Sequence, residues 1–183
     1  MAITTSDEVL SFWFSDRVKP MWFNSTPEFD DELREKYLET YHAALKGELS
    51  DWEKTPQGAL ALVICLDQFP LNMFRNKKES FEGEEPSRQV AVRAIRQGFD
   101  QQLHGAQKAF LYIPFMHSED LADQDYVVSL LSAAGLEDNL HWARHHREIV
   151  RRFGRFPHRN AILGRESTPE ELAYLQSEEA FHG

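Results

Sequence analysis

The chain has 183 residues, of which 42% are hydrophobic, so it is long and apolar enough to bury a sizeable core as one domain (1–183), and wholesale disorder is excluded. Its formal net charge of −10 argues against general nucleic-acid binding.

No run approaches the roughly 20 apolar residues of a membrane span, and the first residues lack the basic start and apolar run of a secretory signal. The single cysteine, Cys65, excludes an intrachain disulfide and a cysteine-based metal site. We therefore expect a cytoplasmic protein without membrane partners, and we interpret Cys65 as a core residue.

Helix starts are the clearest local signals. A threonine at the N-cap accepts a hydrogen bond from an otherwise orphan amide, and a proline at the first helical position has no amide to leave unsatisfied. An acidic residue three positions after the threonine completes a capping box. These signals occur at Thr5–Glu8, Thr26-Pro27, Thr55-Pro56 and Thr168–Glu171.

Hydrophobic periodicity supports helices in the first half of the chain. Apolar residues recur every four positions from Phe29 to Leu45, which predicts a helix that ends at Gly47. The run Ala59–Leu66 is apolar on every side and could be a buried strand. Its alanine and leucine content and the upstream cap favour a buried helix that ends near Pro70.

The second half shows the same helical pattern. Amphipathic helices are predicted over Gln89–Phe99, Ser118–Ala134, Leu136–Phe153 and Thr168–Glu178. One candidate strand remains at Ala109–Met116, and Pro114 interrupts it. The predicted fold class is therefore all-α, with about eight helices joined by short loops.

Four polar residues follow the buried helix and are candidates for ligand binding. Polar side chains at the inner end of a buried helix need partners, so they predict either a pocket wall or a polar network that holds the helix end. The residues are Asp67, Gln68, Asn72 and Arg75.

Histidines supply the candidate catalytic groups. His117 and Glu119 lie at a predicted helix N-terminus, where a histidine could act as a general base and free amides could bind an anion. The alternative is a helix cap with a hydrogen-bonded histidine. His141, His145 and Glu148 share one helical face, but the pattern lacks a second ligand cluster, so we expect no metal site and no cofactor there. His145 remains a candidate acid/base.

An arginine-rich loop is the most distinctive feature. Gly154 ends a helix and Gly164 precedes the next cap, which leaves a loop of about ten residues that also holds His158. From His141 to Arg165 the chain carries seven arginines and one acid, a net charge of +6, against −16 for the rest. Arginine suits bidentate recognition of carboxylates and phosphates. The loop therefore predicts either an anion site or structural ion pairs, formed by Arg155, Arg159, Asn160 and Arg165.

Taken together, these motifs resemble a known family. The stretches Asp67–Pro70, Pro114–Glu119, Arg152–Asn160 and Leu163–Arg165, with Trp22-Phe23, resemble a mainly bacterial family called domain of unknown function 924. The resemblance covers essentially the whole chain. It implies antiparallel helix pairs like tetratricopeptide repeats in a compact α-superhelix, and it implies no activity. The family pattern usually reads Asp-Gln-Phe-Pro-Arg-Asn, and Leu71 replaces its arginine here.

Three functional hypotheses follow. The first is a binding module whose arginine-rich site takes an anionic small molecule or an acidic protein segment. The second is an enzyme for a small anionic substrate, with His117 or His145 as acid/base and the arginines as orienting cations. The third gives these motifs purely structural roles. The 13 phenylalanines and 4 tryptophans also leave room for a homodimer.

Overall fold

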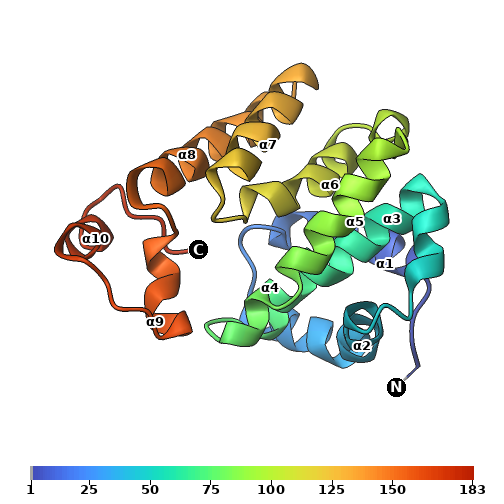
Figure 1. Cartoon of the computed structure of the whole chain (residues 1–183). Coiled ribbons are helices and arrows are strands. Elements are labelled where there is room, and N and C mark those ends of the chain that lie inside the picture. The colour runs from blue at the N-terminus through green and yellow to red at the C-terminus, as the bar shows by residue number, and fades with distance from the viewer. Residues whose placement is uncertain (1) are drawn as a thin grey trace. The chain divides into compact units, whose positions relative to one another are not determined.

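Helices account for the regular structure that the computed structural model describes, which covers residues 2–183 (Figure 1). No strand occurs within this range, so the predicted all-α fold class is confirmed. The α-helices are α1 (Ser6–Trp13), α2 (Pro27–Leu45), α3 (Pro56–Val63), α4 (Phe69–Met73), α5 (Glu84–Arg96), α6 (Ala106–Met116), α7 (Leu121–Ala133), α8 (Glu137–Phe153), α9 (Asn160–Leu163) and α10 (Pro169–Leu175).

The chain forms two compact units. Unit 1 comprises the chain up to Arg75 together with Glu79–Pro114, and unit 2 comprises Asn76–Lys78 together with Phe115–Gly183. Helices α1 to α5 and most of α6 belong to unit 1, and α7 to α10 belong to unit 2. The expectation that the chain folds as one domain stays a prediction.

The predicted helix caps are confirmed. Thr5 and Thr168 form capping boxes with the glutamates three residues later. The side chains of Thr26 and Thr55 accept hydrogen bonds from the backbone at the third helical position, and a proline follows each of them. Local side-chain chemistry therefore sets the start of α1, α2, α3 and α10.

The predicted end of the buried helix near Pro70 is wrong. After α3 the chain passes through a π-helical turn, Ile64–Gln68, and continues directly into α4 with Pro70 in its first turn. Proline has no N–H to donate to the carbonyl of Leu66, four residues earlier. The wider turn absorbs this defect: the N–H of Phe69 donates to the carbonyl of Ile64, five residues back.

Three further predictions need correction. The candidate strand over 109–116 is the second part of α6, which accommodates Pro114 and is fully buried from Ala109 to Met116. Helix α7 starts at Leu121 and not at Ser118, and Asp120 is its N-cap. The Ser118 hydroxyl lies before the helix and accepts a hydrogen bond from the backbone N–H of Asp120. The expected arginine-rich loop is partly helical, with a 3-10 turn followed by α9.

The core of unit 1 is rich in aromatic side chains. Trp13 on α1 is fully buried, and its ring lies 5.7 Å from both Phe69 and Phe110. The indole N–H of Trp22 donates to the Trp13 carbonyl at 2.8 Å, which anchors the segment between α1 and α2. Phe23 beside it is 74% exposed.

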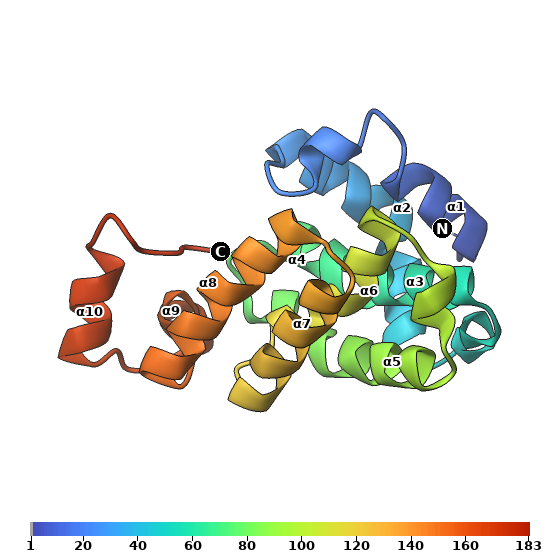
Figure 2. The same ribbon diagram turned by 90° about the horizontal axis from the view of Figure 1, so that it is seen from above.

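Unit 2 is built on the helix pair α7 and α8, which lie side by side (Figures 1 and 2). Gly135 takes a left-handed conformation (φ 67°) between them, so the connection is short and the helices run antiparallel. Gly154, which ends α8, is also left-handed. A small core forms from residues on both sides of it in the chain: Ile149, Val150, Phe156 and Tyr174.

Substitution of Gly83 tests the packing around the π-helical turn. A Cβ atom at Gly83 would lie 2.0 Å from the carbonyl oxygen of Leu66, while its φ of −85° suits any residue. We expect Gly83→Ala to lower the free energy of unfolding by about 3 kcal/mol through overpacking. Gly47→Ala is the control: its Cβ meets open space, and its positive φ predicts a loss of about 1 kcal/mol. Urea denaturation measures both, and equal losses would contradict the steric argument.

Candidate functional site

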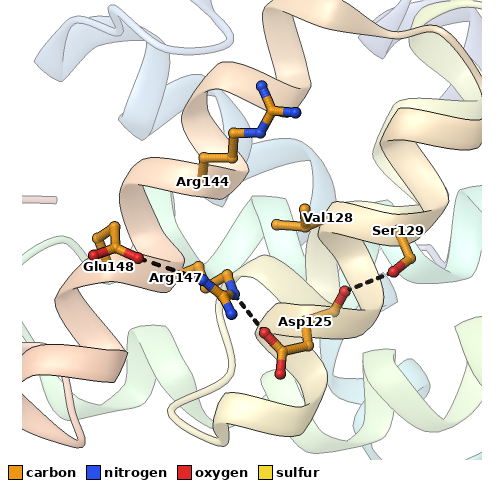
Figure 3. Close-up of a pocket in the computed structure, with 6 residues that line it drawn as sticks. All are labelled: Asp125, Val128, Ser129, Arg144, Arg147 and Glu148. Carbon is orange, nitrogen blue, oxygen red and sulfur yellow. Dashed lines mark hydrogen bonds and ion pairs between the residues drawn. The ribbon is translucent and has the colours of Figure 1, made fainter.

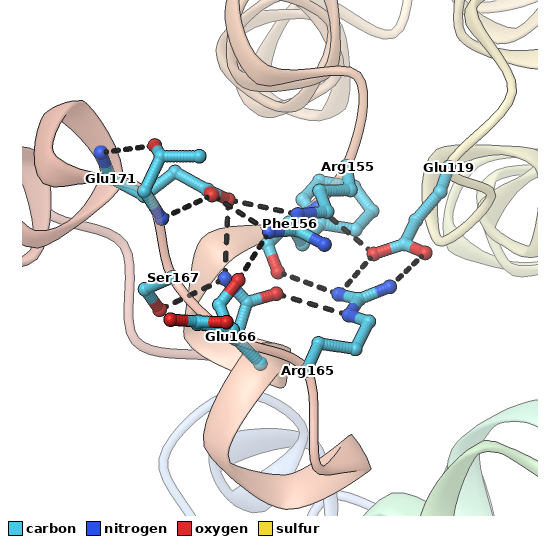
Figure 4. A network of polar contacts seen from close by, with 9 residues as sticks. Glu119, Arg155, Phe156, Arg165, Glu166, Ser167 and Glu171 are labelled. Carbon is cyan, nitrogen blue, oxygen red and sulfur yellow. Dashed lines mark hydrogen bonds and ion pairs between the residues drawn. The ribbon is translucent and has the colours of Figure 1, made fainter.

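Arg155 forms a clamp with Glu171 inside unit 2 (Figure 4). Its Nε and Nη2 atoms donate to the two carboxylate oxygens at 3.0 and 2.8 Å, and Nη2 also donates to the Glu166 carbonyl. Only 2% of the Glu171 side chain is exposed. The Arg155 hydrogen bond lowers the pKa of Glu171 to about 2, and bonds from Thr168 and Asn160 act in the same direction. This arginine holds α10 in place.

Arg165 forms a second bidentate pair, with Glu119 (Figure 4). Its two Nη atoms donate to the carboxylate at 2.8 and 2.9 Å, and its Nε donates to the Asn160 side chain. The backbone N–H of Phe156 donates to the same carboxylate at 2.9 Å. Burial raises the pKa of Glu119, but the Arg165 and Phe156 bonds outweigh it, so the pKa lies below its usual value.

The two ion pairs and the asparagine between them engage three of the predicted ligand-binding residues: Arg155, Asn160 and Arg165. Buried Asn160 donates to Ser167 and to Glu171, and it accepts from Arg165, so it links the two clamps. An external anion would have to displace a carboxylate of the chain from either arginine. The contacts of Arg155, Asn160 and Arg165 therefore favour the structural interpretation of these three residues.

Arg159 has different surroundings. Its side chain is 6% exposed, its Nη2 donates to the carbonyl of His117 at 3.0 Å, and its guanidinium lies 4.9 Å from the ring centroid of Phe156. The charge of Arg159 acts on His146 and on His158. We call His117, His146, His158 and Arg159 the His–Arg cluster.

Aromatic rings surround the imidazoles of this cluster. The ring of His146 lies 5.7 Å from Phe156 and 4.7 Å from Phe181. The ring of His158 lies 5.8 Å and 5.1 Å from the same two phenyl rings. Two histidines and two phenylalanines thus form one group of four rings, to which the C-terminal segment contributes Phe181.

Two histidines of the cluster, His146 and His158, are held in the neutral form. Burial lowers the pKa of His146 to about 4, and the charges of His117, His145 and Arg159 lower it further. Burial and then the charge of Arg159 lower the pKa of His158 to about 3. The Nδ1 atom of His146 lies 2.8 Å from the Trp142 carbonyl, which can only accept, so Nδ1 carries the proton and Nε2 keeps its lone pair.

The predicted catalytic groups lie within the cluster (His117) or beside it (His145 and Glu119). His117 and His145 are partly exposed, and Glu119 is engaged by Arg165. The face with His141 and Glu148 is solvent-exposed, and within residues 2–183 no three histidine, cysteine or acidic side chains are arranged to hold a metal ion. None of the helices in this range has the length and apolar content needed to cross a bilayer.

The polar residues predicted in unit 1 fall into two groups. Asp67 and Gln68 are buried in the π-helical turn, where the Gln68 amide donates to the Asp67 carboxylate at 2.8 Å. Asn72 and Arg75 both donate to Asp30, at 2.7 and 2.8 Å. Burial raises the pKa of Asp30, but the bond from Arg75 and its other bonds outweigh this effect and lower it overall.

Leu71, where the family pattern carries arginine, lies in α4 between these two groups and is partly exposed. The cation of this region is instead Arg75, which is 51% exposed on its side chain and also donates to Ser25 at 2.9 Å. Asp30 therefore has a cationic partner without an arginine at position 71.

A groove of about 510 Å³ lies on the α7–α8 surface of unit 2 (Figure 3). Arg147 pairs there with Asp125 and with Glu148, and Ser129 donates to the Asp125 carbonyl. Arg144, on the rim, forms no ion pair with any residue of the described chain. The groove therefore carries cations and acids in similar number.

Sequence reasoning missed several of these residues. Glu171 could be identified as a capping residue, but not as the partner of Arg155. Asp30 sits beside the apolar stripe of α2 and gives no sign of its burial. His146 carries no local signal of its contact with Phe156, and Phe181 lies beyond the last predicted helix, where no periodicity marks it.

Replacement of Glu171 tests the first clamp through pH. Its folded pKa of about 2 lies below the unfolded value near 4.5, so its stabilising effect is present above pH 4.5 and is lost as the pH falls toward 2. We expect Glu171→Gln to lower the free energy of unfolding by about 3 kcal/mol at pH 7 and by progressively less below pH 4.5. Glu170→Gln, at an exposed neighbour, is the control for urea denaturation. A loss independent of pH would refute the clamp.

His146 and His158 predict a second acid effect at higher pH. Their folded pKa values lie below 6.5, so the unfolded chain binds their protons first, and stability present above pH 6.5 is lost as the pH falls. Between pH 6 and 5 the free energy of unfolding should fall by about 2.4 kcal/mol, and by about half of that in His158→Gln. Exposed His42→Gln should behave like the unmodified chain. Equal slopes for all three proteins would show that His158 is not held neutral.

Comparisons with known proteins identify the family. A model described as "Bacterial protein of unknown function (DUF924)" matches residues 9–179. A solved structure of a protein of unknown function from Agrobacterium tumefaciens is similar to this chain, with 40% sequence identity and a TM-score of 0.88. The match covers 93% of this chain and 96% of that one. No curated protein matches the chain. The resemblance seen in the sequence motifs is confirmed, and the chain belongs to the DUF924 family of bacterial proteins.

Proposed function

We propose that the protein is a binding module that takes a small anionic molecule at the His–Arg cluster of unit 2. The observation that carries the proposal is the composition of this cluster: a buried guanidinium acts electrostatically on two buried or half-buried imidazoles. Within unit 2, the one carboxylate whose charge acts on His158 is Glu119, and both of its oxygens already accept from Arg165. An anion at the cluster would interact favourably with the Arg159 guanidinium and would favour protonation of the two imidazoles.

The clamps support this proposal indirectly. Arg155 and Arg165 fix α10 and the turn before α9, on which His158 and Arg159 lie. A site whose charged groups are held by neighbouring contacts needs little rearrangement when it binds a ligand. In this proposal only Arg159, of the loop arginines, faces the ligand, and the other two arginines position it.

An acidic peptide on the α7–α8 groove is the weaker alternative. The pair α7 and α8 is of the kind that tetratricopeptide-like proteins stack, and Arg144 carries no carboxylate partner among the described residues. Asp125 and Glu148 line the same groove, however, and would repel acidic side chains.

An enzyme acting on a small anion requires a proton-transfer group near the cluster. His146 presents a lone pair on Nε2, but its pKa of about 4 makes it a weak base at neutral pH. His117 and His145 are the accessible alternatives. The protein would be an enzyme if it turned over an identified ligand, and if His117→Ala or His145→Ala abolished this turnover but still bound the ligand.

Inorganic phosphate is the probe for the proposed site. Bound phosphate should raise the midpoint of thermal unfolding, with a stabilisation of about 2.7 kcal/mol at a hundred times the dissociation constant. Because an anion favours the protonated imidazoles, bound phosphate should raise the pKa of both imidazoles, which an NMR titration of their ring resonances measures. The titratable and charged groups that act on the two imidazoles are His117, His145, His182, Arg159 and Glu119.

Two variants and one control complete this test. Arg159→Gln and the milder His158→Gln should each weaken phosphate binding at least about tenfold, the effect of losing roughly 1.4 kcal/mol of interaction. Exposed Arg96→Gln on α5 is the control for a change in net charge. The proposal fails if phosphate leaves the unfolding midpoint unchanged, or if folded His158→Gln binds phosphate as well as the unmodified chain.

A further inference from the structure

The C-terminal segment Ser177–Gly183 places one aromatic ring against the His–Arg cluster. The Phe181 ring lies 4.7 Å from His146, 5.1 Å from His158 and 6.1 Å from His145, and each contact is edge-on. Three imidazoles from two elements, α8 and the turn before α9, therefore surround one phenyl ring. The ring is partly exposed, so it closes the cluster from the outside.

Few interactions hold this ring in place. The segment contains no helix, and the N–H of Phe181 donates to the Tyr174 hydroxyl at 2.9 Å. The Phe181 side chain packs against the edge of the small core around Tyr174. A segment fixed by one ring and few hydrogen bonds opens at low free-energy cost compared with the helices beside it.

The slot that Phe181 fills suits a particular kind of ligand. Edge-on contacts with imidazoles favour a flat aromatic ring over an aliphatic group of similar size. Arg159 acts on the same two histidines from within the cluster and supplies a fixed positive charge. A molecule with an aromatic ring and an anionic group would place its ring in the slot of Phe181 and its anionic group near the charge of Arg159.

We infer that the His–Arg cluster binds an aromatic ring that carries an anionic group, and that Phe181 occupies the ring slot until such a ligand displaces it. This inference rests on the anion site proposed above. Phe181 then acts as a competitor built into the chain, and the apparent affinity for an aromatic anion is reduced by the fraction of molecules in which the slot is filled.

The test compares two probes that differ by the ring. Methyl phosphate reports on the anion site alone, and phenyl phosphate reports on the anion site together with the ring slot. Calorimetry should give a smaller dissociation constant for phenyl phosphate than for methyl phosphate with the full chain. In Phe181→Ala the affinity for phenyl phosphate should increase about tenfold, whereas the affinity for methyl phosphate should change less than about twofold.

Two further variants serve as a second test and as a control for this comparison. Tyr174→Phe removes the hydroxyl that accepts from the Phe181 N–H but keeps its ring in the core, and it should shift phenyl phosphate binding in the same direction as Phe181→Ala. Leu172→Ala, at a side chain 50% exposed on α10, is the matched control and should leave both affinities unchanged. The histidine ring resonances in NMR spectra should move when phenyl phosphate is added to the full chain.

The outcomes separate the two proposals. Binding of methyl phosphate with no preference for phenyl phosphate overturns the ring slot and leaves the anion site standing. Tighter binding of phenyl phosphate that Phe181→Ala weakens also overturns the inference, because Phe181 would then support the ligand and not compete with it. Absence of binding for both probes overturns the proposed function and, with it, this inference.

Discussion

Two guanidinium–carboxylate pairs hold the C-terminal part of unit 2 together, and the placement of His158 and Arg159 in the His–Arg cluster depends on them. Arg155 reaches Glu171 across 16 residues and Arg165 reaches Glu119 across 46. In the segment between Arg155 and Arg165, Phe156 is fully buried but Leu163 is 39% exposed, so hydrophobic burial alone would leave the direction of the second half loosely defined. Bidentate geometry fixes both distance and angle, which is why arginine and not lysine serves here. The pairs thus orient the backbone that carries Arg159.

This arrangement explains how one short segment can be strongly cationic inside an acidic protein. Part of its charge is neutralised locally, since each clamp pairs one arginine with one carboxylate of unit 2. Part is never acquired, because burial lowers the pKa values of His146 and His158 and keeps both imidazoles neutral at pH 7. The first effect stabilises the fold, and the second limits the positive charge that gathers beside Arg159.

The sequence predicted the elements that depend on local chemistry and failed where distant residues decide. The caps at Thr5 and Thr168 could be identified because their partners lie three residues away. The segment 109–116 remained a candidate strand in the sequence because complete burial hides the periodicity on which the distinction from a helix depends. The site residues were found by type, but their partners were not, because the pairing of Arg165 with Glu119 spans almost fifty positions. No local pattern could show which carboxylate each arginine would meet, or that Arg159 would lie close to the histidines.

The π-helical turn at Ile64–Gln68 has a consequence for how this family can change. One extra residue in a helical turn rotates everything after it by about 100° around the helix axis. In this chain that rotation brings Asn72 and Arg75 to face Asp30. Removal of a single residue from the turn would restore a regular helix and carry both side chains to another face, although neither would itself have been altered. The length of this segment is therefore as informative as its composition: two relatives with identical side chains here, but one residue apart in spacing, would present different surfaces.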